Sequence, residues 1–165
     1  MKKIEIKTKF KNYPVIIGDS VLDSVNDLIN TLNLNKNLFV VVDEHVFNLH
    51  KEYITNVFND KTLKASFYKF NSSEFSKSFE SLKEILSELT YKKYGRDTLL
   101  ISIGGGVTGD IAGFASSVYM RGIQVAHIPT TLLACVDSAI GGKTGINFNN
   151  YKNIIGAFQQ PEFVL

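Results

Sequence analysis

Cysteine is nearly absent from the sequence, since Cys135 is its single example. One thiol excludes a disulfide within the chain and a zinc site built from cysteines, and it leaves a reducing compartment as the default environment. The N-terminal segment MKKIEIKTKF contains lysines but no apolar segment behind them, which is not the pattern of a secretory signal. The sequence therefore predicts a cytoplasmic protein.

Long apolar runs and a surplus of one charge are also missing. A bilayer span needs about 18 or more consecutive apolar residues, and no run approaches that length. The 18 Lys and Arg residues nearly balance the 16 Asp and Glu residues, which is not the basic surplus expected of a nucleic-acid-binding domain. We therefore expect a globular domain of 165 residues with a core of its own, and neither a membrane nor a nucleic acid as partner.

Charge and glycine are distributed unevenly along the chain. Residues 98–165 carry six charged side chains and the first 97 residues carry 28, whereas ten of the 12 glycines follow residue 97. An apolar, glycine-rich segment with few charges is typical of buried strands joined by tight loops. The charges in this segment are therefore candidates for a functional site.

Helix and strand patterns alternate along the chain. Alternating or continuous apolar residues predict strands over 4–10, 14–18, 38–42, 63–70, 98–103 and 124–129. Apolar residues three or four apart predict helices that start at Ser20 and near Val107, and others over 44–58 and 75–89. This order predicts an α/β fold: a Rossmann-like, doubly wound, mostly parallel sheet with an N-terminal strand pair, which binds ligands at the carboxyl ends of its strands.

A glycine motif follows the strand at 98–103. Gly104, Gly106 and Gly109 fit G-x-G-x-x-G between a strand and a helix, a pattern that brings backbone N–H groups and a helix N-terminus to a pyrophosphate. The acidic residue that normally follows about 20 positions later is missing, so Asp43, at the end of an earlier strand, is the candidate for a ribose contact. The alternative is that these glycines serve turn geometry alone.

Three charged residues beyond this loop are further candidates. Asp110 is expected in the first turn of the following helix, where a carboxylate is favoured by the helix dipole. The run Gly141–Thr144 looks like the end of a P-loop, but Asp137 stands where that motif needs its first glycine, so an ATP site of that type is rejected. Lys143 and Lys152 are the only lysines after residue 97, and their surroundings favour binding of phosphate or carboxylate.

Six short motifs stand in order within residues 98–161: GGGVTGD, MRG, IPTTLL, VDS, GGKT and KNIIGA. Together with a thinner likeness that extends back to Asp43, they resemble the 3-dehydroquinate synthase family. The resemblance implies an NAD-dependent carbon–oxygen lyase of the shikimate pathway. Such an enzyme converts 3-deoxy-D-arabino-heptulosonate 7-phosphate to 3-dehydroquinate and phosphate, with catalytic NAD and a divalent metal, zinc or cobalt.

The resemblance also implies roles for individual residues. Positions that match the family's NAD site are Asp43, Glu74, Lys77, Gly105, Gly106, Asp110, Thr130, Thr131, Leu133, Asp137, Lys143 and Lys152. Within this set Asp43 would meet the adenosine ribose, and Glu74 with Lys77 the adenosine half, although NSSEFSK lacks the proline and glycine that usually lead into that pair. Positions that match catalytic or substrate contacts are Arg121, Asp137, Lys152 and Asn153.

The resemblance implies more protein than this sequence contains. The family holds its metal with a glutamate and two histidines in a helical C-terminal domain, and His45, His50 and His127 match none of these ligands. Residues 1–165 are therefore expected to be an NAD-binding N-terminal domain with no metal ligand, inactive alone, and Cys135 a small buried residue in a helix. The expected partners are a small sugar-phosphate substrate, the chain's own C-terminal domain and, in a homodimer, a second copy.

Three alternatives stay open on the sequence. Another sugar-phosphate cyclase, such as 2-deoxy-scyllo-inosose synthase, would share the NAD loop, although the MRG motif and the unbroken VDS to GGKT run favour 3-dehydroquinate synthase. A glycerol or iron-type alcohol dehydrogenase would share the architecture but usually lacks the KNIIGA motif. A nucleotide-binding module without enzymatic activity would have no histidine-bearing helical domain after it.

Overall fold

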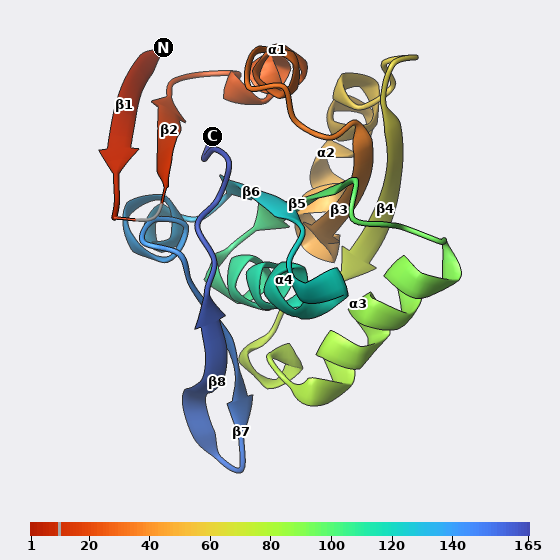
Figure 1. Cartoon of the computed structure of the whole chain (residues 1–165), viewed down its shortest axis with the longest axis vertical. Coiled ribbons are helices and arrows are strands. Elements are labelled where there is room, and N and C mark those ends of the chain that lie inside the picture. Colours follow the sequence, from red (N-terminus) through yellow and green to blue (C-terminus); the bar gives the residue numbers. More distant parts are fainter. Residues whose placement is uncertain (10) are drawn as a thin grey trace.

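The computed structural model describes residues 1–9 and 11–165, and a four-stranded parallel sheet forms its centre (Figure 1). The spatial order is β4-β3-β5-β6, and the strands are β3 (Asn37–Asp43), β4 (Lys64–Phe70), β5 (Thr98–Gly104) and β6 (Gln124–Pro129). Each strand lies where the apolar runs predict one. Phe10, the last residue of the first predicted strand, lies outside the described residues.

Helices cover both faces of this sheet because its strands bury side chains on both sides. Val40 and Val42 of β3 pack into one core together with α1 (Val25–Thr31) and α2 (Glu44–Val57). Phe39 and Val41 pack into the other core together with α3 (Phe79–Tyr91) and α4 (Gly106–Val118). Successive side chains of a strand point to opposite faces, so the continuous apolar runs give a sheet buried on both faces. The predicted Rossmann-like, doubly wound fold is confirmed.

The chain changes direction across the sheet between β3 and β5. From β3 it crosses to β4 on one side, and from β4 it returns past β3 to β5 and then to β6. At such a switch point the connections after two neighbouring strands leave on opposite faces, and a crevice opens at the carboxyl edge. Asp43 ends β3 and Gly104 ends β5. The topology therefore brings the candidate ribose contact to the same crevice as the glycine motif.

An N-terminal hairpin extends the sheet on the side of β6. β1 (Lys2–Lys7) pairs antiparallel with β2 (Asn12–Ile17) without a break in register, which confirms the predicted strand pair. Residues 162–165 run between β6 and β2 and bond to both: Ile16 N donates to Val164 O (2.9 Å), and His127 N donates to Phe163 O (3.2 Å). The last residues of the chain thus join the first two strands to the parallel sheet.

A second hairpin consists of β7 (Lys143–Phe148) and β8 (Tyr151–Phe158). Figure 1 shows it extending away from the sheet, in blue, below α4. The sequence interpretation missed it and treated Lys143 and Lys152 as loop residues. The available signal was the pair Asn149 and Asn150, whose φ values of 48° and 67° are those that a tight two-residue hairpin turn requires.

The structure also corrects three smaller expectations. The helix predicted over 75–89 begins at Phe79, because Ser78 has extended backbone and its side chain accepts from Ser81 N, which starts the helix there. Ser20 makes no side-chain cap: its φ is 51°, and a 3-10 turn (Val21–Ser24) follows it. Cys135 is exposed in a π-helical turn (Ala134–Ser138) rather than buried in a helix. Among the described residues, no helix is long and apolar enough to span a bilayer.

Candidate functional site

The glycine loop lies at the carboxyl edge of β5 and is closely packed. A Cβ on Gly105 would lie 3.3 Å from Thr131 Cγ2, and one on Gly106 would lie 3.0 Å from Ser138 Oγ. Thr130 N donates to Gly104 O (2.9 Å), so the end of β6 is tied to the same loop. The predicted cofactor positions Gly105, Gly106, Thr130 and Thr131 are therefore neighbours.

Helix α4 begins directly after this loop. A helix leaves its first N–H groups without partners inside the helix, and within the described part of the chain no side chain caps α4 at Gly105. These N–H groups and the positive end of the helix dipole favour an anion. This arrangement fits a pyrophosphate.

Asp43 lies one strand away, at the carboxyl end of β3. Its Oδ1 accepts from Val46 N (3.0 Å) and so caps α2. It also lines a small surface cleft of about 250 Å³ with Asn48, Asn71 and other residues. Asp43 thus has a structural role at the position where a ribose contact is predicted.

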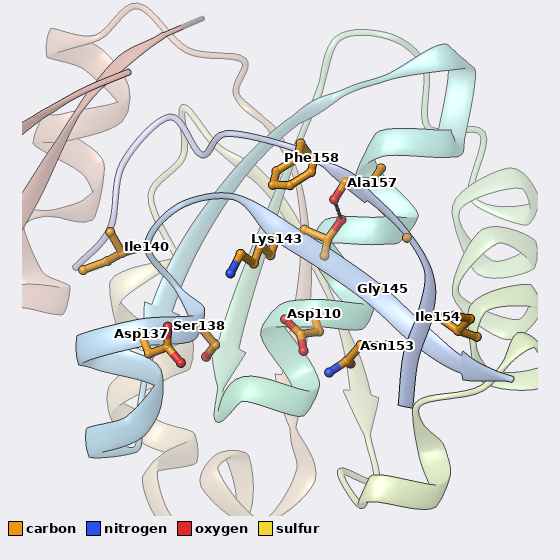
Figure 2. A pocket seen from close by; sticks show the side chains of 12 residues that line it. Asp110, Asp137, Ser138, Ile140, Lys143, Gly145, Asn153, Ile154, Ala157 and Phe158 are labelled. Carbon is orange, nitrogen blue, oxygen red and sulfur yellow. Dashed lines mark hydrogen bonds between the residues drawn. The ribbon is translucent and has the colours of Figure 1, made fainter. Parts of the chain in front are cut away.

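The polar candidates converge in a cleft of about 540 Å³ between α4, the π-helical turn and the second hairpin (Figure 2). Asp110 comes from α4, Asp137 from the turn, Lys143 from β7 and Asn153 from β8. Figure 2 shows the side chains of Asp110 and Asn153 pointing toward each other below Lys143. Residues from four elements or turns far apart in sequence thus line this space, and Lys77, from a fifth segment, contacts Asp110 and Asn153.

Lys77 is the buried centre of the site. Its side chain is 5% exposed, and its Nζ donates to Asp110 Oδ2 and to Asn153 Oδ1. Asp110 stands in the second turn of α4, so the expected role in the first turn is wrong, and the carboxylate pairs with Lys77 instead. Burial raises the pKa of Asp110 above its usual value, Lys77 opposes this rise, and the neighbouring carboxylates Glu74 and Asp137 add to it.

Glu74 forms a second polar group beside Lys77. The Nδ2 of Asn147 on β7 donates to Glu74 Oε1 (2.9 Å), and Lys152 Nζ lies 3.5 Å from the same oxygen. The hydrogen bond from Asn147 is the main cause that lowers the pKa of Glu74, and the charges of Lys152 and Lys77 lower it further. The predicted E-x-x-K pair is therefore linked to the hairpin despite its unusual flanking sequence.

A β-bulge directs the hairpin residues toward the site. The strands pair at Ile146 with Ile155 and at Phe148 with Tyr151, so three residues of β8 lie opposite Asn147. Asn153, within these three, has a φ of 54°. Bulges change the direction of side chains and are common beside functional sites. The bulge explains how two successive residues, Lys152 and Asn153, both reach the polar cluster.

Glycines let the hairpin close on itself. A Cβ on Gly156 would lie 2.0 Å from Thr144 O, and one on Gly145 would lie 2.6 Å from Ile155 O. The φ values of Gly141 and Gly142, 96° and 72°, turn the chain into β7. Lys143 then begins a strand, whereas the lysine of a P-loop opens a helix. The rejection of an ATP site of that type is confirmed.

Two candidates lie apart from the cleft. Arg121 belongs to a 3-10 turn (Tyr119–Arg121) between the end of α4 and the start of β6, where Arg96 Nε bonds Met120 O (3.4 Å). That is the amino edge of the sheet, opposite the glycine loop. Leu133 is 70% exposed beside the π-helical turn and is not among the residues that line the cleft.

The histidines are dispersed, as expected. His45 and His50 are exposed on α2, and His127 is buried in β6. His127 Nδ1 lies 2.7 Å from Ser102 Oγ, and burial lowers the pKa of His127 to about 4. In the part of the chain that the structure describes, no group of three or more His, Cys, Asp or Glu side chains could hold a metal ion.

The switch point, the glycine loop and the cleft at one edge define a Rossmann-like α/β domain with a loop suited to an anion. The chain belongs to the 3-dehydroquinate synthase family, because the family profile described as "3-dehydroquinate synthase N-terminal" matches residues 67–165.

Relatives in this family are similar along nearly the whole chain. Proteins named 3-dehydroquinate synthase are 45% identical over 155 residues in Alkaliphilus oremlandii and 42% identical over 165 residues in Pelagibacter ubique. These matches cover 92% and 99% of this chain but only 41% and 44% of the relatives. The chain therefore spans less than half the length of these relatives.

Solved structures show the same fold. A structure of 2-deoxy-scyllo-inosose synthase matches with a TM-score of 0.90 and 27% identity, over 99% of this chain and 46% of that chain. Another structure of that name is a complex with carbaglucose-6-phosphate, NAD+ and Co2+. Glycerol dehydrogenase from Schizosaccharomyces pombe matches with a TM-score of 0.69 and 19% identity, over 91% of this chain and 36% of that chain, a likeness of fold alone.

Proposed function

We propose that this chain binds NAD and provides the cofactor side of a 3-dehydroquinate synthase. The observation that carries the proposal is the convergence of a glycine loop, a helix N-terminus and the cluster that the buried Lys77 forms with Asp110 and Asn153. The name of the family and the NAD complex of a similar cyclase support it.

NAD would lie along the carboxyl edge from β3 to the cleft. The pyrophosphate would bind at the N-terminus of α4, which begins directly after Gly105. Asp43 would contact the adenosine ribose, as its place at the switch point suggests. When bound, NAD accepts a hydride and can return it, which is chemistry that no side chain supplies.

The substrate would enter the cleft beside the second hairpin. Lys143 carries a positive charge there, and Asn153 adds an amide. Lys152, the residue before Asn153, lines a second cleft together with Glu74 and Lys77. An ammonium beside a departing phosphate stabilises the charge that develops on it. The side chain of Lys152 is 71% exposed and its Nζ lies 3.5 Å from Glu74 Oε1, an exposed contact that leaves it able to reach a ligand. We propose that Lys152 neutralises the leaving phosphate.

A further domain would complete the site. Two exposed apolar side chains line the cleft, Ile154 with an exposed fraction of 60% and Phe158 with 77%. Leu133 and Val136, in and beside the π-helical turn, are also 70% and 65% exposed. Such side chains favour coverage by another protein surface. We propose that residues 1–165 are an NAD-binding N-terminal domain and that a C-terminal domain covers this face. The divalent metal would need ligands from that domain, since the described residues offer no such group.

The test uses the polypeptide in which this chain continues into the proposed C-terminal domain. Calorimetry should show one NAD per chain, and steady-state assays should show phosphate release from the seven-carbon substrate. Lys152→Ala should lower turnover more than substrate affinity, and Lys152→Arg should restore little, because a planar guanidinium does not replace a compact ammonium. Lys3→Ala, on the exposed β1, is the matched control.

Two results would contradict the proposal. A Lys152→Ala turnover within about twofold of wild type, less than 0.5 kcal/mol of barrier, would remove the role of Lys152. Phosphate release from glucose 6-phosphate in place of the seven-carbon substrate would assign the chain to the other cyclase activity, which the high similarity to 2-deoxy-scyllo-inosose synthase makes the second candidate.

A further inference from the structure

Asn147 occupies the junction between the two halves of the candidate site. Its Nδ2 donates to Glu74 Oε1 (2.9 Å) and to Glu74 O (3.2 Å), and its Oδ1 accepts from Asn153 N (2.9 Å). Its backbone N donates to Lys77 O (2.8 Å). One side chain and its own backbone thus contact three of the predicted site residues, although no motif singles out Asn147.

The contact to Asn153 replaces a missing bond of the β-ladder. Regular pairing stops between Ile146 and Phe148, and the three bulged residues of β8 lie opposite Asn147. Within this bulge Asn153 adopts a φ of 54°, a conformation that costs free energy for a residue other than glycine unless its surroundings hold it. The Asn147 amide oxygen holds the Asn153 N–H and so fixes the bulge.

The contacts to Glu74 fix the other side. Glu74 and Lys77 belong to the short segment between β4 and α3, which carries no long helix or strand of its own. Asn147 donates three hydrogen bonds to this segment. Its side-chain amide donates to Glu74 Oε1 and Glu74 O, and its backbone N donates to Lys77 O. Because one amide bonds both elements, it holds Glu74 and Asn153 at a fixed position relative to each other.

We propose that Asn147 is a positioning residue that couples the cofactor side of the site, Glu74 and Lys77, to the substrate side, Lys152 and Asn153. The proposal rests on the function proposed above. Asn147 acts through the bulge and touches neither ligand. Its loss should let Lys152 and Asn153 move from their productive places while the domain remains folded.

The experiment is a double-mutant cycle in the polypeptide that includes the C-terminal domain. Asn147→Ala should lower kcat/KM for phosphate release by about 10- to 100-fold, the effect expected of a misplaced catalytic group. In the Lys152→Ala background the same change should cost less than about threefold, because the residue through which Asn147 acts is already gone. Asn12→Ala, on a strand of the other hairpin, should stay within about twofold of wild type.

Binding and exchange measurements separate positioning from a loss of folded protein. A mere folding defect lowers the NAD stoichiometry but leaves the NAD Kd and the substrate KM unchanged, whereas positioning raises both constants at full stoichiometry. Amide hydrogen exchange at Asn153 should be about tenfold or more faster in Asn147→Ala than in Asn12→Ala, with β3 and β5 unaffected.

The outcomes are distinct for the two proposals. Additive effects of Asn147→Ala and Lys152→Ala, or unchanged KM and Kd, would overturn the positioning role while leaving the function in place. If wild-type protein neither binds NAD nor releases phosphate, the proposed function fails. Amide hydrogen exchange then decides by itself whether Asn147 fixes the bulge. An unchanged exchange rate at Asn153 in Asn147→Ala would overturn this role of Asn147 as well.

Discussion

The two hairpins of this domain have the same antiparallel pairing and opposite character. β1 and β2 pair over six successive residues without a break, and their partner segment 162–165 joins them to the sheet. β7 and β8 contain a bulge, three asparagines with positive φ and glycines in close backbone contact. The regular hairpin extends the sheet, and the irregular one carries the candidate site, which shows that departures from ideal geometry concentrate where side chains must be aimed.

The largest effect should come from filling the close approach in the irregular hairpin. Gly156→Ala places a Cβ 2.0 Å from Thr144 O, a backbone atom that cannot rotate away. We expect a loss of about 3 kcal/mol or more of unfolding free energy, or a displaced hairpin. Denaturant titration measures it. Gly18→Ala, where a Cβ would lie 3.1 Å from Met1 Cα and Cγ, is the matched control and should cost less than about 1 kcal/mol, because this contact is more than 1 Å longer.

The sheet that the regular hairpin extends should become less stable in acid because of His127. Its folded pKa of about 4 lies below the ordinary value of 6.5, so between these values the unfolded chain binds a proton that the folded chain does not. The unfolding free energy that depends on neutral His127 is fully present above pH 6.5. It falls by about 3 kcal/mol in total as the pH drops to 4. His127→Asn should flatten this part of the stability profile; an equally steep profile in the variant would contradict the assignment.

Two lysine–carboxylate pairs, one beside the irregular hairpin and one at the turn of the regular hairpin, should differ in strength. Lys77 is buried against Asp110, whereas Lys11 pairs with Glu162 with about a third of its side chain exposed. Lys77→Met leaves a half-buried carboxylate without its partner and should cost about 2 kcal/mol, with weaker NAD binding. Lys11→Met should cost less than about 1 kcal/mol. Equal losses in thermal or denaturant unfolding would refute the comparison.

The smallest loss of stability should come from removing a hydrogen bond between the regular hairpin and the turn that leads into β7. Tyr13 of β2 is fully buried, and its hydroxyl accepts from Gly141 N (3.2 Å), just before Lys143. Tyr13→Phe removes the hydroxyl and keeps the ring, so we expect a loss of about 1 kcal/mol. A lower denaturation midpoint with an unchanged m-value would confirm it, and a loss above that of Lys77→Met would show that the regular hairpin matters more to the site than we propose.

Local pattern in the sequence determined most of the fold. Continuous apolar runs predicted β3, β5 and β6 because strands buried on both faces need apolar side chains at every position. Spacing of three to four predicted α2 closely, and the start of α3 was missed by four residues because exposed Phe75 fits the same spacing. The motif order identified the family, and the glycine loop was placed correctly before α4.

The tertiary structure alone decided how the candidates meet. Asp110 was predicted in the first turn of its helix, but it stands in the second turn and pairs with a lysine 33 positions earlier in the chain. No local pattern reveals a bulge at Lys152 and Asn153, because it depends on which residues of two strands oppose each other. The role of Asn147 follows from contacts to residues 73 and six positions away. Sequence spacing specifies elements, whereas a site built from five of them is specified only by how they pack.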